Sequence, residues 1–487
     1  MNKISNTNPF ELLSNLLSNF LSNFSDKRED YTNGFGFEMP ESIHPIFLNM
    51  YAQNLGRDFG LFDIIQHLKY TYFSPNLDTG LTTNRKMCPI IFIPGLGVSK
   101  IKGKWDQSGS KSGKQGDKQS DTQSTCTTQR DWTKIWFPEE NGYFKNNCIT
   151  DSVKVVYKKM SGDVINANGV STVIESFGSI SFDPESYLAD WLEAVRALGY
   201  TENQNLFGAA YDFRKICSKE ELYNYCMSLK QLIEHSVKMN GKKAILVGHS
   251  LGSNLANYFL VTMPSEWKDM YINSFASFSG AFGGCPKALR TILSGVDTSV
   301  GIINKSEKEI LRNITRNFTG LQWMLPSPAI YNDIPLVHYN NVSYSANNIH
   351  QLLHMVGAVE AADIYKNVVY PIQMESLKAP GVKVYTFSGT NLMTESSYKY
   401  RDSLEDNPVK NHPYYKMNQS YAANIDYPEE FNGDGTIPHF VLQHPLTWTN
   451  YQKEPIIYRF YDRAEHKDIL VTEQPVNDFI SILKQAA

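Results

Sequence analysis

The stretch from Lys242 to Leu260 constrains the fold of this 487-residue chain more than any other part of it. Ala244 to Val247 is a short apolar run typical of a buried strand, and Gly-His-Ser-Leu-Gly follows it directly. Apolar residues then recur at helical spacing up to Leu260. A strand, a tight turn between small residues and a helix hold the central hydroxyl at the carboxyl edge of a sheet. Because the helix N-terminus favours negative charge there, Ser250 is predicted to be a nucleophile.

Other strands and helices alternate along the chain on both sides of this stretch. The composition suits a large core, since 41% of the residues are hydrophobic and 20% are charged. The expected strands are residues 88–93, 154–157, 206–214, 272–280, 382–387 and 455–460, and the expected helices are residues 187–198, 220–239 and a final segment that includes Val476. This alternation predicts an α/β fold, with a mostly parallel sheet and helices on both of its faces.

Composition divides the chain into an N-terminal extension, residues 1–85, and a catalytic domain, residues 86–487. The extension carries apolar residues at helical spacing, at Phe10, Leu13, Leu17, Phe20 and Phe24. They predict an amphipathic helix. Three roles are open for it: packing against the protein body, adhesion to a membrane surface, or service as a leader segment. Within the domain, residues 104–150 include a polar surface insertion rich in Ser, Gly, Lys and Gln. The irregular segment 284–380, which lies between two strands, is expected to form a cap over the site.

Charge, hydropathy and cysteine spacing argue against several other classes of protein. The net charge of −4 does not suit a nucleic-acid-binding surface. The sequence has no uninterrupted apolar run of the 18 residues that a membrane span needs. The six cysteines lack the paired spacing of a zinc site. Glycosylation sequons, which give weak support for a secretory route, occur at Asn23, Asn304, Asn313, Asn317, Asn341 and Asn418.

A serine nucleophile needs a base within hydrogen-bond reach and a third group to orient that base. In a strand–turn–helix site of this kind, the acid and then the histidine follow the serine along the chain. Asp434 lies in a Gly-Asp-Gly turn and is the expected acid, the alternative being an ordinary surface turn. His466, in the loop after the last strand, is the expected base, the alternative being an exposed structural histidine.

Two nearer histidines suit the role of the base less well. His439 is too close to the acid along the chain to reach the serine from the next loop, and His444 precedes a proline. The oxyanion that forms on attack also needs two N–H donors. The backbone N–H groups of Leu251, directly after the serine, and of Leu96, in the loop after the first strand, are the expected pair. The Leu96 loop is equally compatible with a plain strand-ending turn.

Several further motifs occur in one order along the chain, from residue 88 to the C-terminus. They are Ile93–Gly97, Lys134–Trp136, Ala209–Arg214, Val247–Gly252, Glu266–Asp269, Ser279–Gly284, Trp323–Pro326, Asp434–Thr436 and Glu465–His466. Together they resemble the lecithin–cholesterol acyltransferase and lysosomal phospholipase A2 family. The resemblance implies an α/β-hydrolase fold, an acyl-Ser250 intermediate and a Ser250–Asp434–His466 triad. It also implies that Leu96 and Leu251 form the oxyanion hole and that the reaction uses no metal or organic cofactor.

The same resemblance implies a disulfide between Cys126 and Cys148 that closes a membrane-binding loop, with Trp136 inside the loop as a lipid contact. A buried aromatic cluster around Trp136 is the alternative. Residues 287–308 would form a mobile lid in the cap, with hinges at Gly295 and Gly301. The implied partners are a phospholipid surface and either water or a lipid alcohol, such as a sterol, as acyl acceptor. The implied location is the secretory route, peripheral on membranes.

The chain also departs from the family pattern. The region of Phe387 carries no second pair of cysteines, and the early loop has Gly97-Val98 where the family often has a glycine one position later. Two other functions stay open at this point. One is a neutral lipase or esterase that acts on acylglycerols. The other is a lipid-binding protein with an inactive triad.

Overall fold

The chain divides into two compact units, residues 1–80 and residues 81–487. The computed structural model describes residues 87–105, 129–136, 147–175, 177–182, 184–295, 305–406, 408 and 432–486, all of which belong to the second unit. Three expectations therefore lie outside the described residues. They are the N-terminal extension over residues 1–85 with its amphipathic helix, the polar stretch 106–128 with Cys126, and the middle of the expected lid with Gly301.

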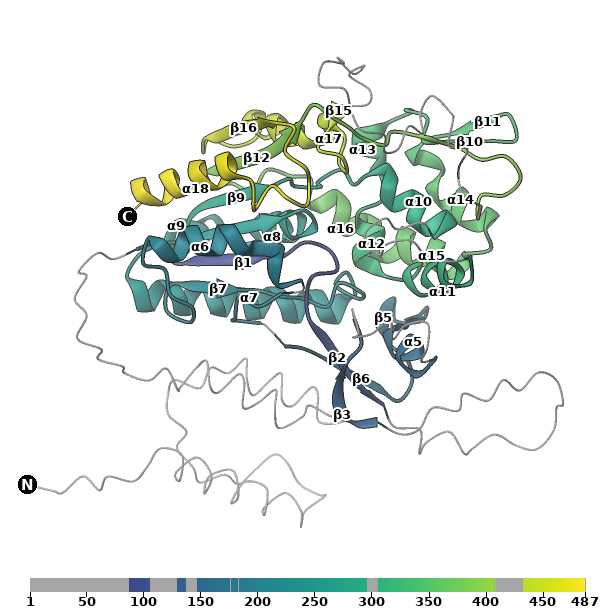
Figure 1. The fold of residues 1–487 in the computed structure, drawn as a ribbon, viewed down its shortest axis with the longest axis horizontal. Coiled ribbons are helices and arrows are strands. Elements are labelled where there is room, and N and C mark those ends of the chain that lie inside the picture. The colour runs from purple at the N-terminus through teal and green to yellow at the C-terminus, as the bar shows by residue number, and fades with distance from the viewer. Residues whose placement is uncertain are drawn as a thin grey trace, which may run out of the picture. The chain divides into compact units, whose positions relative to one another are not determined.

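A six-stranded parallel sheet forms the centre of the second unit (Figure 1). Its order is β16-β12-β9-β8-β1-β7. The strands are β1 Ile90–Ile93, β7 Leu206–Gly208, β8 Ala244–His249, β9 Ile272–Phe278, β12 Val384–Thr390 and β16 Ile456–Asp462. Each contains or overlaps a run that the sequence predicted to be a strand. Because all six strands are parallel, their carboxyl ends lie at the same edge of the sheet. Ligands bind at this edge in open α/β sheets.

Strand residues alternate between two separate hydrophobic cores, one on each face of the sheet. In β8, Ala244 and Leu246 pack in the first core, whereas Ile245 and Val247 pack in the second. Burial on both faces explains why β1 and residues 244–247 of β8 are continuously apolar in sequence. The sequence and the structure therefore agree on the α/β-hydrolase arrangement, a parallel sheet covered on both sides.

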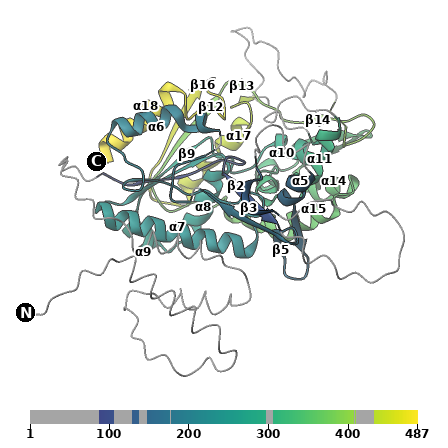
Figure 2. The ribbon, with the colours of Figure 1, turned by 60° about the horizontal axis from the view of Figure 1, so that its bottom comes forward.

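Helices α6 (Ala189–Ala197) and α18 (Glu473–Ala486) lie side by side over one face of the sheet (Figure 1, Figure 2). The rings of Trp191 and Phe479 stack between them with centroids 5.6 Å apart. Helices α7 (Lys219–Asn240) and α8 (Leu251–Thr262) supply Leu229, Leu255 and Phe259 to the core on the other face. Helix α7 ends where predicted, because Gly241 adopts the left-handed conformation with φ of 62° and caps it.

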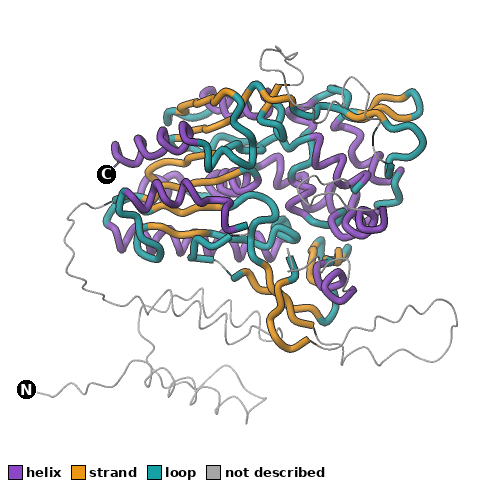
Figure 3. The backbone as a smooth tube through the Cα atoms, viewed as in Figure 1, coloured by secondary structure: helices purple, strands orange, loops and turns teal. Residues whose placement is uncertain are grey.

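The segment between β9 and β12 is expected as an irregular cap and is mostly helical, as Figure 3 shows. Its helices are α10 Pro286–Ser294, α11 Lys305–Thr315, α12 Thr319–Trp323, α13 Pro328–Tyr331, α14 Ile349–Met355, α15 Val359–Ile364, the π-helical turn η5 Tyr365–Val369 and α16 Tyr370–Glu375. Most are one or two turns long. Such short segments show too few repeats for helical periodicity to be recognised in the sequence.

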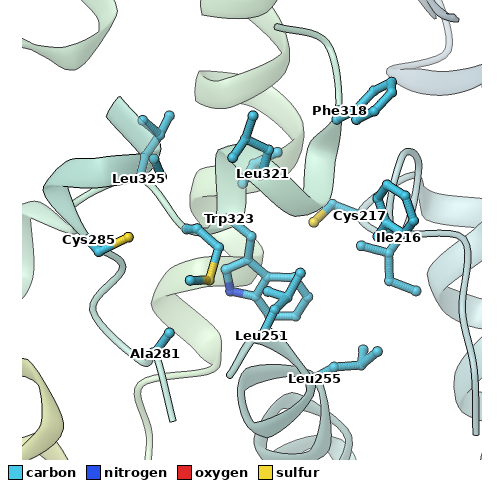
Figure 4. Close-up of a cluster of buried hydrophobic side chains, with 14 of the residues drawn as sticks. Ile216, Cys217, Leu251, Leu255, Ala281, Cys285, Phe318, Leu321, Trp323 and Leu325 are labelled. Carbon is cyan, nitrogen blue, oxygen red and sulfur yellow. The ribbon is translucent and has the colours of Figure 1, made fainter. Parts of the chain in front are cut away.

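The cap packs directly against the start of helix α8. In Figure 4, Leu251 and Leu255 of α8 lie beside Leu321 and Trp323 of α12 in one buried cluster. The Trp323 indole N–H donates to the Ser376 hydroxyl at 3.2 Å. The residue that follows the candidate nucleophile is thus held by the cap as well as by the sheet.

A smaller β subdomain follows strand β1. Strands β2 (Ile101–Trp105), β3 (Gln129–Lys134) and β6 (Val170–Ile174) form an antiparallel sheet in the order β3-β2-β6. Helix α5 (Asn147–Val153) and the hairpin of β4 (Val155–Lys158) and β5 (Asp163–Asn166) complete it. Residues 155–157 of the expected strand 154–157 therefore lie in β4, but β4 pairs in this hairpin and not in the central sheet.

The remaining elements are short. They are η2 Glu185–Leu188, α9 Ser265–Tyr271, β10 Val337–Tyr339, β11 Val342–Tyr344, η4 Ala346–Asn348, β13 Leu392–Met393, β14 Tyr398–Lys399, β15 Asn432–Gly433, α17 His439–Leu442 and η7 His444–Asn450. Among the helices that the structure describes, none combines the length and the apolar character needed to cross a bilayer.

Candidate active site

Ser250 connects strand β8 to helix α8 in a strained backbone conformation, with φ of 53° and ψ of −124°. Few residues other than glycine adopt positive φ, and such strain concentrates at functional sites. The flanking glycines make the turn possible. A Cβ atom on Gly248 would lie 2.7 Å from the Cα of Ser253, and one on Gly252 would lie 2.2 Å from the carbonyl oxygen of Ile93. The small residues in the motif are therefore required by backbone-to-backbone packing.

The structure brings Ser250, His466 and Asp434 together from three distant parts of the chain. Nε2 of His466 lies 2.9 Å from the Ser250 hydroxyl, and its Nδ1 lies 2.8 Å from Oδ2 of Asp434. Ser250 follows β8 and His466 follows β16, so both stand at the carboxyl edge of the sheet. All three residues are buried.

The acid is held in place by its own turn. Oδ1 of Asp434 accepts hydrogen bonds from the backbone N–H groups of Thr436 at 3.0 Å and Ile437 at 2.7 Å. The backbone N–H of His466 donates to the Asp434 carbonyl oxygen at 2.8 Å. Because a carboxylate only accepts, Nδ1 of His466 carries the proton and Nε2 is left to accept the proton of the serine hydroxyl. This arrangement suits general-base activation of Ser250.

The two nearer histidines, His439 and His444, form their contacts elsewhere. Nδ1 of His439 lies 3.3 Å from the Thr390 hydroxyl, and its ring packs on Phe460. Nε2 of His444 lies 2.9 Å from the Leu377 carbonyl oxygen. The ring that lies 2.9 Å from the Ser250 hydroxyl is that of His466.

The loop after β1, residues 94–99, is fixed by contacts from three sides. The Tyr211 hydroxyl donates to the Pro94 carbonyl at 3.0 Å, and the Gly95 N–H donates to the Tyr187 hydroxyl at 3.0 Å. The Trp136 indole N–H donates to the Gly97 carbonyl at 2.5 Å. Within the described part of the chain, the backbone N–H groups of Leu96 and Leu251 have no acceptor. Leu251 directly follows Ser250, and the loop that carries Leu96 lies close to it, since a Cβ atom on Gly95 would be 3.3 Å from the Ser250 Cβ.

His249 and Tyr187, for which the sequence predicts no role, also lie at this site. The Tyr187 hydroxyl lies 2.6 Å from Nδ1 of His249, and Nε2 of His249 lies 2.9 Å from the His466 carbonyl oxygen. Burial, followed by repulsion from His466, lowers the pKa of His249 to about 3. Sequence offers no signal for this contact, because Tyr187 and His249 come from segments 62 positions apart.

Trp136 lies against the same loop and not on an open surface. Its ring packs on Phe213 at 4.9 Å and on Phe318 at 6.0 Å between centroids, and the side chain is only partly exposed. The ring therefore lies in an aromatic cluster near the candidate site. Cys148 is disulfide-bonded, while its expected partner, Cys126, lies outside the described residues. Cys88, Cys217, Cys226 and Cys285 are free thiols.

The expected lid begins with a helix. Residues 286–294 form α10, most of whose side chains are buried. Gly295, one of the two expected hinges, caps this helix with φ of 69°. A Cβ atom there would lie 2.6 Å from Cβ of Arg312 in α11, so the glycine allows α10 and α11 to approach closely.

Comparisons with known proteins bear on this site. The family model described as lecithin:cholesterol acyltransferase matches residues 133–360, a range that includes Ser250. A bovine (Bos taurus) lysosomal phospholipase A and acyltransferase is 27% identical over 330 residues, which cover 66% of this chain and 75% of the relative. A mouse (Mus musculus) phosphatidylcholine-sterol acyltransferase is 27% identical over 345 residues, covering 69% of this chain and 74% of the relative.

Among solved structures, a Tle4–Tli4 complex aligns with a TM-score of 0.46 and 13% identity, covering 82% of this chain and 99% of that chain. The sequence comparisons agree with the resemblance read from the ordered motifs. Residues 133–360 are therefore similar to the lecithin:cholesterol acyltransferase family, and the chain adopts an α/β-hydrolase fold.

Proposed function

We propose that this protein is a serine-dependent acyl-transferring enzyme that acts on glycerophospholipids. Ser250 takes the acyl chain, and the acyl-enzyme then passes it to water, as a phospholipase A, or to a lipid alcohol such as a sterol. The observation that carries the proposal is the chain of hydrogen bonds from Ser250 through His466 to Asp434 at the carboxyl edge of the sheet. The names of the relatives, a phospholipase A and acyltransferase and a phosphatidylcholine-sterol acyltransferase, support the substrate class.

The chemistry follows from the positions of the polar atoms. His466 takes the hydroxyl proton through Nε2 while Oγ of Ser250 attacks the ester carbonyl carbon. The negative charge that develops on the carbonyl oxygen is stabilised by the N–H groups of Leu96 and Leu251. Collapse of the intermediate breaks the ester bond, and His466 returns the proton to the departing lysophospholipid oxygen. Water or an alcohol then attacks the acyl-serine by the same steps in reverse.

The aromatic cluster beside the site supports an apolar substrate. Trp136, Phe213 and Phe318 form one group of rings next to the Gly97 carbonyl, where the acyl chain can pack. In this proposal Trp136 contacts lipid at the site, and a disulfide between Cys126 and Cys148 closes the loop that meets the phospholipid surface. The cap over residues 284–380, with a lid in its first part, controls access. The proposed compartment is the secretory route, on the luminal or outer face of membranes.

Acyl release from vesicles tests this proposal. Ser250→Ala is expected to abolish the release of labelled fatty acid from phosphatidylcholine vesicles and to leave the melting temperature close to that of the wild type. Ser236→Ala is the matched control, because Ser236 is also buried but donates its hydroxyl to Ile233 within helix α7 at 2.8 Å. Unchanged release by the Ser250 variant would contradict the proposal.

The alternative enzyme, a neutral lipase or esterase, makes a different prediction with the same protein. An enzyme adapted to phospholipid surfaces loses most of its activity when vesicles are replaced by a soluble short-chain ester. Faster turnover of the soluble ester, or of triacylglycerol emulsions, would favour the alternative. Adding a sterol to the vesicles and identifying the acylated products distinguishes transfer to an alcohol from hydrolysis. A lipid-binding protein with an inactive triad would release no fatty acid from vesicles, from the soluble ester or from triacylglycerol emulsions.

A further inference from the structure

A buried chain of hydrogen bonds connects the two sides of the candidate active site. It begins at the N–H of Gly95, after strand β1, and passes through the Tyr187 hydroxyl at 3.0 Å. From Tyr187 it reaches Nδ1 of His249 at 2.6 Å, and from Nε2 of His249 it reaches the His466 carbonyl at 2.9 Å. The chain therefore joins the loop expected to bind the oxyanion to the loop that carries the base.

The direction of each hydrogen bond follows from the chemistry of the atoms. A carbonyl oxygen only accepts, so Nε2 of His249 must carry a proton. Burial and the nearby His466 lower the pKa of His249 to about 3, which keeps the ring neutral and leaves Nδ1 without a proton. Nδ1 therefore accepts from the Tyr187 hydroxyl, whose oxygen accepts from the Gly95 N–H. Every polar atom of the chain is satisfied in this single arrangement.

The packing around the chain leaves little freedom for its members to move. A Cβ atom on Gly95 would lie 3.0 Å from Nδ1 of His249, 3.3 Å from Cβ of Ser250 and 3.4 Å from the Tyr187 hydroxyl. The Tyr187 ring also packs edge-on against Phe92 and Phe182, with centroids 6.3 Å and 6.2 Å away. The rings of His249 and His466 lie 5.2 Å apart. Rearrangement of one member would therefore displace the others.

We propose that Tyr187 and His249 are positioning residues that set the distance between the Gly95–Leu96 loop and the His466 loop. The Tyr187 hydroxyl engages the Gly95 N–H and so leaves the next N–H, that of Leu96, for the oxyanion. His249 fixes the backbone carbonyl of the residue whose ring activates Ser250. Neither side chain has to touch substrate for this role. The inference rests on the proposed function, because it concerns how the oxyanion-binding loop and the base are kept at the right distance from Ser250.

The rate at which a fluorophosphonate labels Ser250 tests the proposal without depending on lipid specificity. In this reaction the serine oxygen bonds to phosphorus, fluoride leaves and His466 takes the hydroxyl proton, so both loops contribute. Tyr187→Phe is expected to lower the labelling rate about 10- to 100-fold, since small misplacements at an active site have effects of this size. His249→Leu is expected to do the same. The double variant is expected to be no slower than the slower single variant, because both changes break one chain.

Two further variants separate positioning from a general loss of packing. Tyr200→Phe is the matched control, because Tyr200 is buried and its hydroxyl donates to the Cys88 carbonyl at 3.0 Å, before β1 and away from the site. It is expected to leave the labelling rate unchanged. His249→Gln is expected to be labelled faster than His249→Leu, because the amide supplies both an acceptor and a donor. A merely structural role would give no such rescue by glutamine at equal melting temperature.

The outcomes distinguish the two proposals. If the wild type reacts but Tyr187→Phe is labelled within about twofold of Tyr200→Phe, the positioning role is wrong and the serine chemistry stands. Additive losses in the double variant would also contradict the positioning role. A wild-type protein that is not labelled at Ser250 at all would contradict both proposals. If Tyr187→Phe fails to fold, the labelling rates of His249→Gln and His249→Leu test the positioning role. Equal rates for these two variants would contradict it.

Discussion

The backbone of Ser250 carries strain that costs about 1–3 kcal/mol and is maintained only by its surroundings. The Ser250 N–H donates to the Phe278 carbonyl at 3.0 Å, and Gly248 and Gly252 provide the space for the turn. The hydroxyl is consequently fixed before substrate arrives. Pre-organisation of this kind favours a reaction in which the nucleophile must approach along one direction.

Asp434→Asn tests how the base is oriented. The asparagine amide can occupy the carboxylate position, but its N–H₂ group facing His466 would require Nδ1 to accept, which moves the imidazole proton to Nε2 and blocks removal of the serine proton. We expect fatty-acid release to fall about 10³- to 10⁴-fold with little change in melting temperature. A loss of less than tenfold would show that the Asp434 contact at 2.8 Å does not set the tautomer.

His249 predicts a particular dependence of stability on pH. Its pKa is about 3 in the folded protein against 6.5 for an ordinary histidine, so between these values the unfolded state binds more protons. The folded state therefore loses stability as the pH falls through this window, by about 1.4 kcal/mol per pH unit at most. The charged or titratable groups that face the ring are His466, Asp434 and Tyr187.

The pH dependence of the unfolding free energy is compared between the wild type and His249→Gln, whose side chain at this position cannot titrate. Urea unfolding at pH 6.5 and pH 5 is expected to show the wild type losing roughly 2 kcal/mol more than the variant across that interval. Parallel losses in the two proteins would contradict a neutral, buried His249. Because only the difference between two pH values is used, any constant effect of the substitution on stability cancels.

At the scale of elements, the central strands were predictable and the cap helices were not. Strand β8 is buried along its whole length, and its first four residues, Ala244 to Val247, are an apolar run between a lysine pair and a glycine. The helices α12 and α13 have five and four residues, which is too short for a periodic pattern. Residues 154–157 also read as a strand, but Val156 is exposed, as suits a peripheral hairpin.

The same contrast holds within the site. The contact among Ser250, Asp434 and His466 could be predicted because each lies in a local motif and the order of the three along the chain is constrained. Tyr187 and His249 could not be assigned a role, because their contact depends on how η2 packs beside β8. Trp136 was recognisable as an aromatic residue between Cys126 and Cys148, whereas its hydrogen bond to the Gly97 carbonyl depends on tertiary packing.

The junction of β8 and α8 predicts the effect of Gly252→Ala. The new Cβ would meet the carbonyl oxygens of Ile93 at 2.2 Å and Pro94 at 2.4 Å, so helix α8 must move away from β1. We expect a loss of about 1–3 kcal/mol in unfolding free energy together with slower labelling of Ser250 by a fluorophosphonate. Gly162→Ala is the control, since its Cβ would meet nothing within 4 Å and only its φ of 71° is unfavourable. Equal effects of the two variants on labelling would contradict this prediction.

At the scale of the whole catalytic unit, one buried arginine connects the central sheet to the small β subdomain. Arg214, just after β7, pairs with Asp212 and donates to the carbonyls of Ser152 at 3.3 Å and Val153 at 3.1 Å. Its other terminal nitrogen, Nη2, reaches Thr172 of strand β6 at 3.1 Å. Because the pair is almost inaccessible to solvent, its hydrogen bonds must be satisfied from both parts.

Arg214→Met is therefore expected to lower the unfolding free energy by about 3–5 kcal/mol, because it leaves the Asp212 carboxylate buried without its main partner. Arg196→Met is the control, since Arg196 pairs with Glu202 at the surface and such pairs contribute about 0–1 kcal/mol. Asp212→Leu combined with Arg214→Met should be less damaging than Arg214→Met alone. Similar effects of Arg214→Met and Arg196→Met would contradict the connecting role.

The central claim is that Ser250 carries the acyl group during turnover. The most direct measurement is acid quenching of the wild-type protein during reaction with phosphatidylcholine vesicles that contain an isotope-labelled acyl chain, followed by peptide mass spectrometry. We predict the labelled acyl mass on the peptide that contains Ser250, its absence in Ser250→Ala, and a steady-state level that disappears once the phospholipid is consumed. Release of fatty acid with the acyl mass on another residue, or on none at any quench time while Ser250→Ala remains active, would contradict the account.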